Sequence, residues 1–139
     1  MKILIKNGRV INPASGFDEI CDVAVESPHV IAIKNIAKNF APDMTVDATG
    51  CIVTAGLVDL AARLREPGHE HEGMLQSELA AAVAGGVTSL VCMPDTEPVI
   101  DQVALVDYVQ RRARERAIVN VCIMAAATRG LKGEEMAEI

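Results

Sequence analysis

The sequence contains almost no aromatic residues. Its 139 residues include no tryptophan, one tyrosine and two phenylalanines, together 2% of the chain. Aromatic side chains are the usual stacking platforms for single-stranded nucleic acids. Basic residues are also in the minority, since 13 lysines and arginines face 19 acidic residues and give a net charge of -6. This balance repels phosphate backbones and anionic lipids, so we expect no nucleic-acid or membrane partner.

Long hydrophobic runs are also absent. The longest uncharged run, residues 79–94, is shorter than the roughly 20 apolar residues of a membrane span, and Gly85-Gly86 interrupts it. The N-terminus turns after a few residues and lacks the continuous apolar stretch of a signal peptide. The four cysteines form no Cys-x-x-Cys pair, so we predict buried reduced thiols and a cytoplasmic protein.

Hydrophobic residues make up 50% of the chain, enough for a core of aliphatic side chains. In residues 1–54 they form short alternating runs. Asn7-Gly8 between two such runs predicts a hairpin turn, and residues 26–29 separate a second pair of strands. A third pair flanks residues 47–50. We predict a small antiparallel β module.

From residue 51 the pattern changes to apolar strands that alternate with helical periods. The predicted order is strand 52–60, helix 72–84, strand 87–93, helix 102–116, strand 118–124 and a helix opening at Gly133-Glu134. This order predicts βαβ units and a parallel sheet covered on both faces. We expect the arginine-rich run 111–116 to be a solvated helix end, since cations favour that end of the helix dipole.

The strand that begins near Gly56 leads into polar residues. If the chain stays extended, Asp59, Ala61, Arg63 and Arg65 share one face, because side chains alternate along a strand. In a parallel (β/α) barrel that face can point toward the mouth where active sites lie.

At this point the sequence resembles the dihydroorotases, cyclic amidohydrolases of the amidohydrolase superfamily. The blocks that carry the resemblance occur in order along the whole chain: Ile5-Lys6-Asn7-Gly8-Arg9-Val10-Ile11-Asn12-Pro13, Asp47-Ala48-Thr49-Gly50, Gly56-Leu57-Val58-Asp59, Leu64-Arg65-Glu66-Pro67-Gly68, Gly85-Gly86-Val87-Thr88, Cys92-Met93-Pro94 and Gly130-Leu131-Lys132-Gly133-Glu134-Glu135. The chain corresponds to about the first third of a typical member.

The resemblance implies an α/β fold, with an incomplete (β/α) TIM-type barrel of three strand-helix units. Residues 55–139 would form this truncated part. Residues 1–54 would form a partial β-sandwich-like module, which C-terminal residues complete in longer members. A full barrel takes roughly 250 residues, so open sheet edges here favour self-association.

The family motif reads Asp-x-His-x-His-Leu-Arg-Glu-Pro-Gly, and both histidines bind zinc in active relatives. In this chain those positions hold Ala61 and Arg63. Alanine has no donor atom, and arginine brings a fixed positive charge without a lone pair. We therefore predict no metal ligand, no cofactor and no catalytic residue here.

Two residues match positions that bind substrate in the family. Arg65 matches the arginine that holds the carboxylate of dihydroorotate, and Asp95 stands where an asparagine contacts the substrate. A carboxylate there repels an anionic substrate unless an arginine neutralises it. We predict that Asp95 pairs with Arg63 or Arg65 and fills part of a vestigial pocket; the alternative is a surface turn residue after Pro94.

His69 and His71 follow Pro67-Gly68, just before a predicted helix. We interpret them as loop and helix-start residues, with metal binding as the alternative; His29 lies in a predicted turn. The resemblance implies a catalytically inactive homologue that assembles with aspartate carbamoyltransferase. A zinc-dependent dihydroorotase with ligands recruited from His69 and His71 is the second hypothesis, and a truncated piece is the third.

Overall fold

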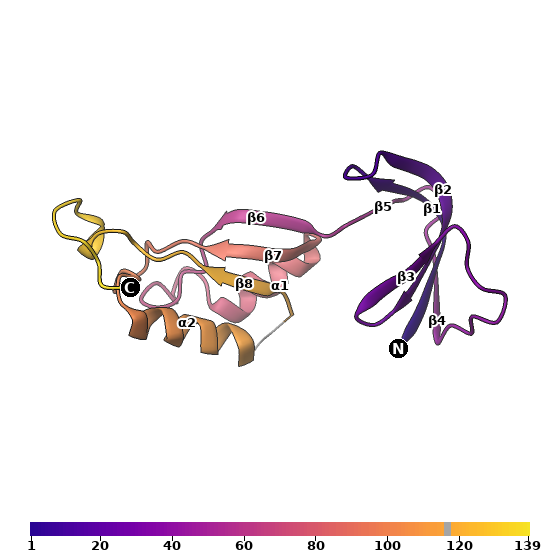
Figure 1. The fold of residues 1–139 in the computed structure, drawn as a ribbon. Helices are drawn as coiled ribbons and strands as arrows, with labels where there is room; N and C mark the ends of the chain where they lie inside the picture. The colour runs from indigo at the N-terminus through magenta and orange to yellow at the C-terminus, as the bar shows by residue number, and fades with distance from the viewer. Residues whose placement is uncertain (116–117) are drawn as a thin grey trace. The chain divides into compact units, whose positions relative to one another are not determined.

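The computed structural model describes residues 1–115 and 118–139, and the chain divides into two compact units, Met1–Ala55 and Gly56–Ile139 (Figure 1). None of the helices in these described ranges is long and apolar enough to cross a membrane. Arg116, where the second predicted helix was expected to end, lies outside the described residues.

The first unit is one five-stranded sheet. Its strands are β1 (Lys2–Asn12), β2 (Phe17–Glu26), β3 (His29–Ile33), β4 (Met44–Asp47) and β5 (Ile52–Thr54). The order is β3-β2-β1-β4, and β5 also pairs with β1. The predicted pairing of β2 with β3 is confirmed and is antiparallel.

The predicted hairpin at Asn7-Gly8 is wrong. β1 runs straight through these residues, and its pairing with β2 shifts register between Ile5 and Gly8. Asn7 has a φ of 62°, so it uses its tolerance of the left-handed region to make a β-bulge and not a turn. A side chain at Gly8 would bring its Cβ within 2.5 Å of the Cγ2 of Val53, which explains why glycine follows the bulge.

The predicted purely antiparallel module is wrong, because the sheet contains both antiparallel and parallel pairs. β4 and β5 do not pair with each other; each runs parallel to β1, one on either side of the bulge. The segment between them continues along β1, because the amide of Ala48 donates to the Lys6 carbonyl at 2.8 Å and that of Arg9 donates to the Cys51 carbonyl at 3.0 Å. The turn residues between β4 and β5 therefore carry the chain past the bulge of β1 in the same direction, and do not reverse it into a hairpin.

The second unit contains the predicted alternation of strands and helices. Its elements are β6 (Leu57–Ala62), α1 (Leu75–Ala84), β7 (Val87–Cys92), α2 (Val103–Glu115), β8 (Asn120–Ile123) and the 3-10 turn η1 (Arg129–Leu131). The three strands are parallel in the order β6-β7-β8. The predicted strand 52–60 is divided between β5 and β6, because its two halves pair with different sheets.

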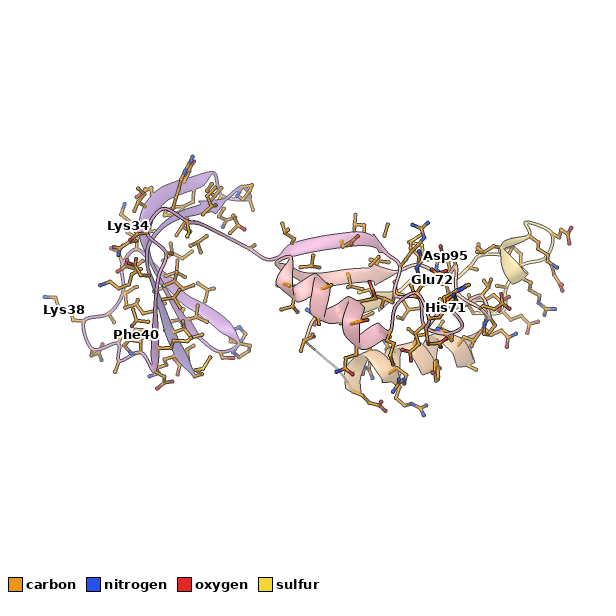
Figure 2. All side chains as sticks on the ribbon, turned by 180° about the vertical axis from the view of Figure 1, so that it is seen from behind. Lys34, Lys38, Phe40, His71, Glu72 and Asp95 are labelled. Carbon is orange, nitrogen blue, oxygen red and sulfur yellow. The ribbon has the colours of Figure 1, made fainter. Side chains whose placement is uncertain are left out.

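Both helices cover the same face of this sheet, where coverage of both faces was predicted (Figures 1 and 2). The core between helices and sheet contains Leu75 and Leu79 of α1, Leu90 of β7 and Val109 of α2. Leu75 and Leu79 of the predicted apolar face are 2% and 0% exposed, but Val83 of the same face is 45% exposed. By contrast, three apolar residues of β6 are more than half exposed: Leu57, Val58 and Leu60.

The helix predicted to open at Gly133-Glu134 is absent from the described residues. The end of the chain instead folds back as an extended arm, with isolated bridges between Thr128 and Met136 and between Gln102 and Glu138. Gly133 has a φ of 75°, which is outside the helical region. The backbone groups of the arm form hydrogen bonds with residue 102 and residues 127–129. A segment as short as 133–139 is also of marginal length for an isolated helix.

Burial was predicted for all four cysteines, but only Cys92 is buried. Burial raises the pKa of its thiol to about 11, so it remains protonated near neutral pH. Cys51, just before β5, and Cys122, in β8, are exposed, because the neighbouring sheets have an uncovered side. Their apolar sequence neighbours predicted burial that the open sheets do not supply.

Asp47, at the end of β4, is the carboxylate through which we expect the first unit to respond to acid. Its carboxylate accepts hydrogen bonds from the hydroxyl and the amide of Thr49 at 2.6 and 3.1 Å and from the Nδ2 of Asn7 at 3.2 Å. The bonds from Thr49, and then that from Asn7, lower the pKa of Asp47 below its ordinary value of 3.8. The stability they supply is complete above pH of about 4 and is lost as the pH falls through the lowered pKa.

We therefore expect Asp47→Asn to flatten the acid side of the stability curve of residues 1–55. Urea midpoints of amides in β1, followed by NMR between neutral and acid pH, measure this effect. The exposed Asp107→Asn variant on α2 is the control and should leave those midpoints unchanged. Parallel pH curves for the Asp47→Asn variant and the unsubstituted chain would contradict the assignment.

Candidate functional site

The candidate site lies where β6 ends. The strand stops at Ala62, and its pairing with β7 shifts register between Asp59 and Ala62. The Asp59 carboxylate folds back to accept the amide of Ala61 at 2.9 Å. Arg65 has a φ of 64°, so the chain has left the extended conformation there. The predicted continuous stripe from Asp59 to Arg65 is therefore wrong, because the strand is interrupted and then ends.

Arg63 and Asp95 form an ion pair across the ends of β6 and β7. The Nε of Arg63 donates to Oδ2 of Asp95 at 2.6 Å, and the two side chains are 55% and 38% exposed. This confirms the prediction that Asp95 pairs with one of two arginines. The alternative, a surface residue after Pro94, also holds in part, because Asp95 is an exposed residue of that loop.

Arg65 has a different partner. Its Nε lies 3.2 Å from Oε2 of Glu72, and both side chains are partly exposed. The structure therefore brings Asp95 to Arg63 and Arg65 to Glu72, and the two predicted substrate-binding residues do not share an ion pair. An anionic ligand at Arg65 would share the guanidinium with Glu72 or displace it.

Glu66 is the residue of this region that sequence reasoning missed. It is 4% exposed, and its carboxylate accepts the amide of Leu75 at 3.2 Å and the Nε of Arg112 at 3.0 Å. A carboxylate at the first amides of α1 satisfies a free donor and the positive end of the helix dipole. An acidic residue just before Pro67-Gly68, ahead of a helix without an N-cap side chain, was the available signal.

Arg112 also corrects the description of the arginine run as a solvated helix end. The hydrogen bond from its guanidinium to Glu66, followed by the attraction between their charges, raises the pKa of Arg112. One arginine of the run thus points inward and joins α2 to the loop before α1. Helical spacing alone does not show which member of a charge run has a buried partner.

The loop after β7 docks on the Pro67-Gly68 segment. The amide of Glu97 donates to the carbonyl of Pro67 at 3.1 Å, and buried Thr96 donates its hydroxyl to the Pro98 carbonyl at 2.8 Å. Gly68 has a φ of 94°, and a Cβ there would overlap the carbonyl oxygen of Glu97. The Arg-Glu-Pro-Gly segment therefore positions the loop that carries Asp95.

His69 lies in the turn before α1. His71 and Glu72, labelled in Figure 2, lie in the same turn. The amide of Glu72 donates to the His69 carbonyl at 2.9 Å, and α1 begins only at Leu75. The predicted helix start at residue 72 is therefore wrong by three residues. One ligand atom from each of His69, His71 and Glu72 lies within 4.8 Å of the other two.

The end of β6 does not fit a catalytic zinc ion. Such a site needs about three protein ligands and an open position for water. Ala61 offers only its methyl group, and the guanidinium of Arg63 is a cation already held by Asp95. Placing a dication beside this guanidinium would add charge repulsion without adding a ligand.

Solved structures with the same fold are amidohydrolases. The L-hydantoinase (dihydropyrimidinase) of Arthrobacter aurescens superposes with a TM-score of 0.79 and 23% identity, covering 91% of this chain and 28% of that one. The dihydropyrimidinase of Brevibacillus agri gives 0.76 and 24%, covering 92% and 28%. At these identities the likeness shows the fold alone.

The chain belongs to the Dihydro-orotase-like family, whose model matches residues 50–139. A dihydroorotase-like protein of Pseudomonas putida is 43% identical over 139 residues, covering 100% of this chain and 33% of its own length. A dihydroorotase of Pelobacter propionicus is 48% identical with the same coverage. The chain thus spans about a third of the curated relatives it matches, and the resemblance seen in the sequence is confirmed.

Proposed function

We propose that this chain belongs to a dihydroorotase-family protein that does not hydrolyse dihydroorotate and instead serves as a structural partner of aspartate carbamoyltransferase in the cytoplasm. The Arg63–Asp95 ion pair carries the proposal. It joins two positions that, in active relatives, hold a zinc ligand and a substrate-binding amide. The pair satisfies both charges without metal or substrate.

The chemistry of hydrolysis supports this reading. Opening the cyclic amide of dihydroorotate needs water made nucleophilic near neutral pH, which zinc achieves by lowering the pKa of bound water. Neither Ala61 nor Arg63 can hold that ion. Arg65 is retained but bound to Glu72, so we regard Arg65 and Asp95 as vestiges of a substrate pocket.

The surface of β6 supports a role in assembly. Leu57, Val58 and Leu60 are 57%, 61% and 69% exposed on a strand with one unpaired edge in the described residues. We infer that β6, β7 and β8 are the first strands of a (β/α) barrel, and that such a surface is covered by further chain, by a second copy or by the carbamoyltransferase.

A zinc-dependent dihydroorotase is the second candidate. The observation that favours it is the proximity of His69, His71 and Glu72, a ligand set known from catalytic zinc sites. These residues lie on the loop beyond β6 and not on the strand itself. A water activated on that loop would reach a substrate near Arg65 from a different direction than one activated at the strand.

A chimera tests whether hydrolysis is lost because the strand lacks its metal ligands or because this chain spans only part of its relatives. Residues 1–139 replace the aligned first third of the Pelobacter propionicus dihydroorotase, whose sequence aligns over the whole chain. We expect dihydroorotate hydrolysis to fall at least about 1,000-fold, because the strand no longer helps to hold the metal that activates water. Adding Ala61→His, Arg63→His and Asp95→Asn to the chimera should restore most of it.

Hydrolysis by the unsubstituted chimera at the parent rate would contradict the inactive reading. Circular dichroism and gel filtration of both chimeras control for folding. Assembly is tested separately by gel filtration of this chain with aspartate carbamoyltransferase from the same organism. Co-elution is expected, and Leu60→Asp should weaken it; independent elution would exclude the partnership for residues 1–139.

A further inference from the structure

The turn between β6 and α1 gathers two of the three histidines of the chain. His69 and His71 have ring centroids 6.1 Å apart with planes inclined by 52°. The Nε2 of His71 lies 3.8 Å from Oε1 of Glu72. Backbone hydrogen bonds hold the turn, since the amide of His69 donates to the Arg65 carbonyl at 2.9 Å and that of Glu72 to the His69 carbonyl at 2.9 Å.

The spacing of the three side chains suits a transition-metal ion. Two ligands of a tetrahedral zinc ion, each about 2.1 Å from the metal, lie about 3.4 Å apart. The three ligand atoms here lie within 4.8 Å of one another. Exposed side chains close that difference by small rotations, because His71 is 74% and Glu72 is 44% exposed.

Neighbouring groups decide which carboxylate takes part. The Oε1 of Glu70 accepts the amide of Gly68 at 3.0 Å. Glu70 is therefore committed to the loop backbone. Glu72 remains beside the imidazoles, with Arg65 as its counter-charge.

We propose that His69, His71 and Glu72 form a zinc-binding site on this turn, separate from the strand position held by Ala61 and Arg63. Two imidazoles with one carboxylate suit zinc better than the oxygen-seeking ions magnesium and calcium. Zinc competes with Arg65 for Glu72. Binding of the metal therefore releases the guanidinium of Arg65 toward an anionic ligand.

Zinc titration of the chain tests the site, with cobalt(II) as a coloured substitute that reports coordination number. We expect one ion per chain and a loss of affinity of at least about tenfold in His69→Ala and in His71→Ala. His29→Ala is the matched control, because His29 is in β3 of the other unit and should leave the affinity unchanged. Absence of binding, or equal binding by all three variants, would overturn the proposal.

The neighbouring carboxylates and the arginine give a second test. Glu72→Gln should weaken zinc binding several-fold, whereas Glu70→Gln should not. Arg65→Gln should strengthen it, because the competing cation is removed; weaker binding in that variant would refute the competition. The site goes beyond the proposed function, and dihydroorotate hydrolysis by the zinc-loaded chain would refute the inactive reading while leaving the metal site intact.

Discussion

Replacing Glu66 by alanine is expected to lower the free energy of unfolding of residues 56–139 by about 3 kcal/mol. Glu66 is 4% exposed and binds both the first amide of α1 and the guanidinium of Arg112. Truncation leaves a helix amide without its acceptor and leaves Arg112 with only the exposed Glu115 as counter-charge. The two helices would then be joined only through their apolar contacts.

Urea unfolding followed by the helical circular dichroism signal measures this loss, since α1 and α2 both belong to this unit. Glu66→Gln keeps an acceptor for Leu75 but no charge, so its loss should be intermediate. Glu115→Ala is the control: it removes the exposed partner that lies 3.5 Å from Arg112 and should cost less than about 0.5 kcal/mol. Equal losses in the Glu66→Ala and Glu115→Ala variants would refute a structural role for Glu66.

Gly68→Ala is expected to destabilise the same unit by about 3 kcal/mol or more. The left-handed φ of 94° disfavours any side chain, and the added Cβ would overlap the carbonyl oxygen of Glu97. The backbone of the loop after β7 must then move. The hydrogen bond from the Glu97 amide to the Pro67 carbonyl should be lost, and Asp95 should separate from Arg63.

Gly86→Ala separates the two causes. Gly86 has a φ of 81° but nothing within 4 Å of an added Cβ, so only the conformational cost of about 1 kcal/mol should appear. The difference between the variants measures the overlap with Glu97. If both lose the same free energy, the contact between the two loops contributes nothing. Amide hydrogen exchange at Glu97 provides an independent reading of the lost bond.

The fold was predictable where the hydrophobic period is long and local. Leu75 and Leu79 lie on the buried face of α1, as helical spacing indicated, and the parallel strands follow from the alternation of strands and helices. The first unit was less predictable, because Asn7-Gly8 suits a turn and a bulge equally well in isolation. The choice between a turn and a bulge depends on how β1 pairs with β2 and with β4 and β5, and the last two strands are distant from β1 in sequence.

The candidate site was predictable in its substitutions and only partly in its contacts. The motif located Ala61 and Arg63, and charge balance predicted a partner for Asp95. It could not choose between Arg63 and Arg65, because that choice depends on where β6 ends and on the turn that brings Glu72 to Arg65. The buried role of Glu66 depends on Arg112, which is 46 residues away in sequence.

The Arg63–Asp95 pair also makes the change at this strand difficult to reverse. A single return of Arg63 to histidine would leave Asp95 without its cation while Ala61 still offered no donor. A single return of Asp95 to asparagine would leave the guanidinium of Arg63 unmatched. Either of these two single substitutions loses an existing contact before a metal can compensate, and Ala61→His alone would add one donor beside the unchanged Arg63 guanidinium.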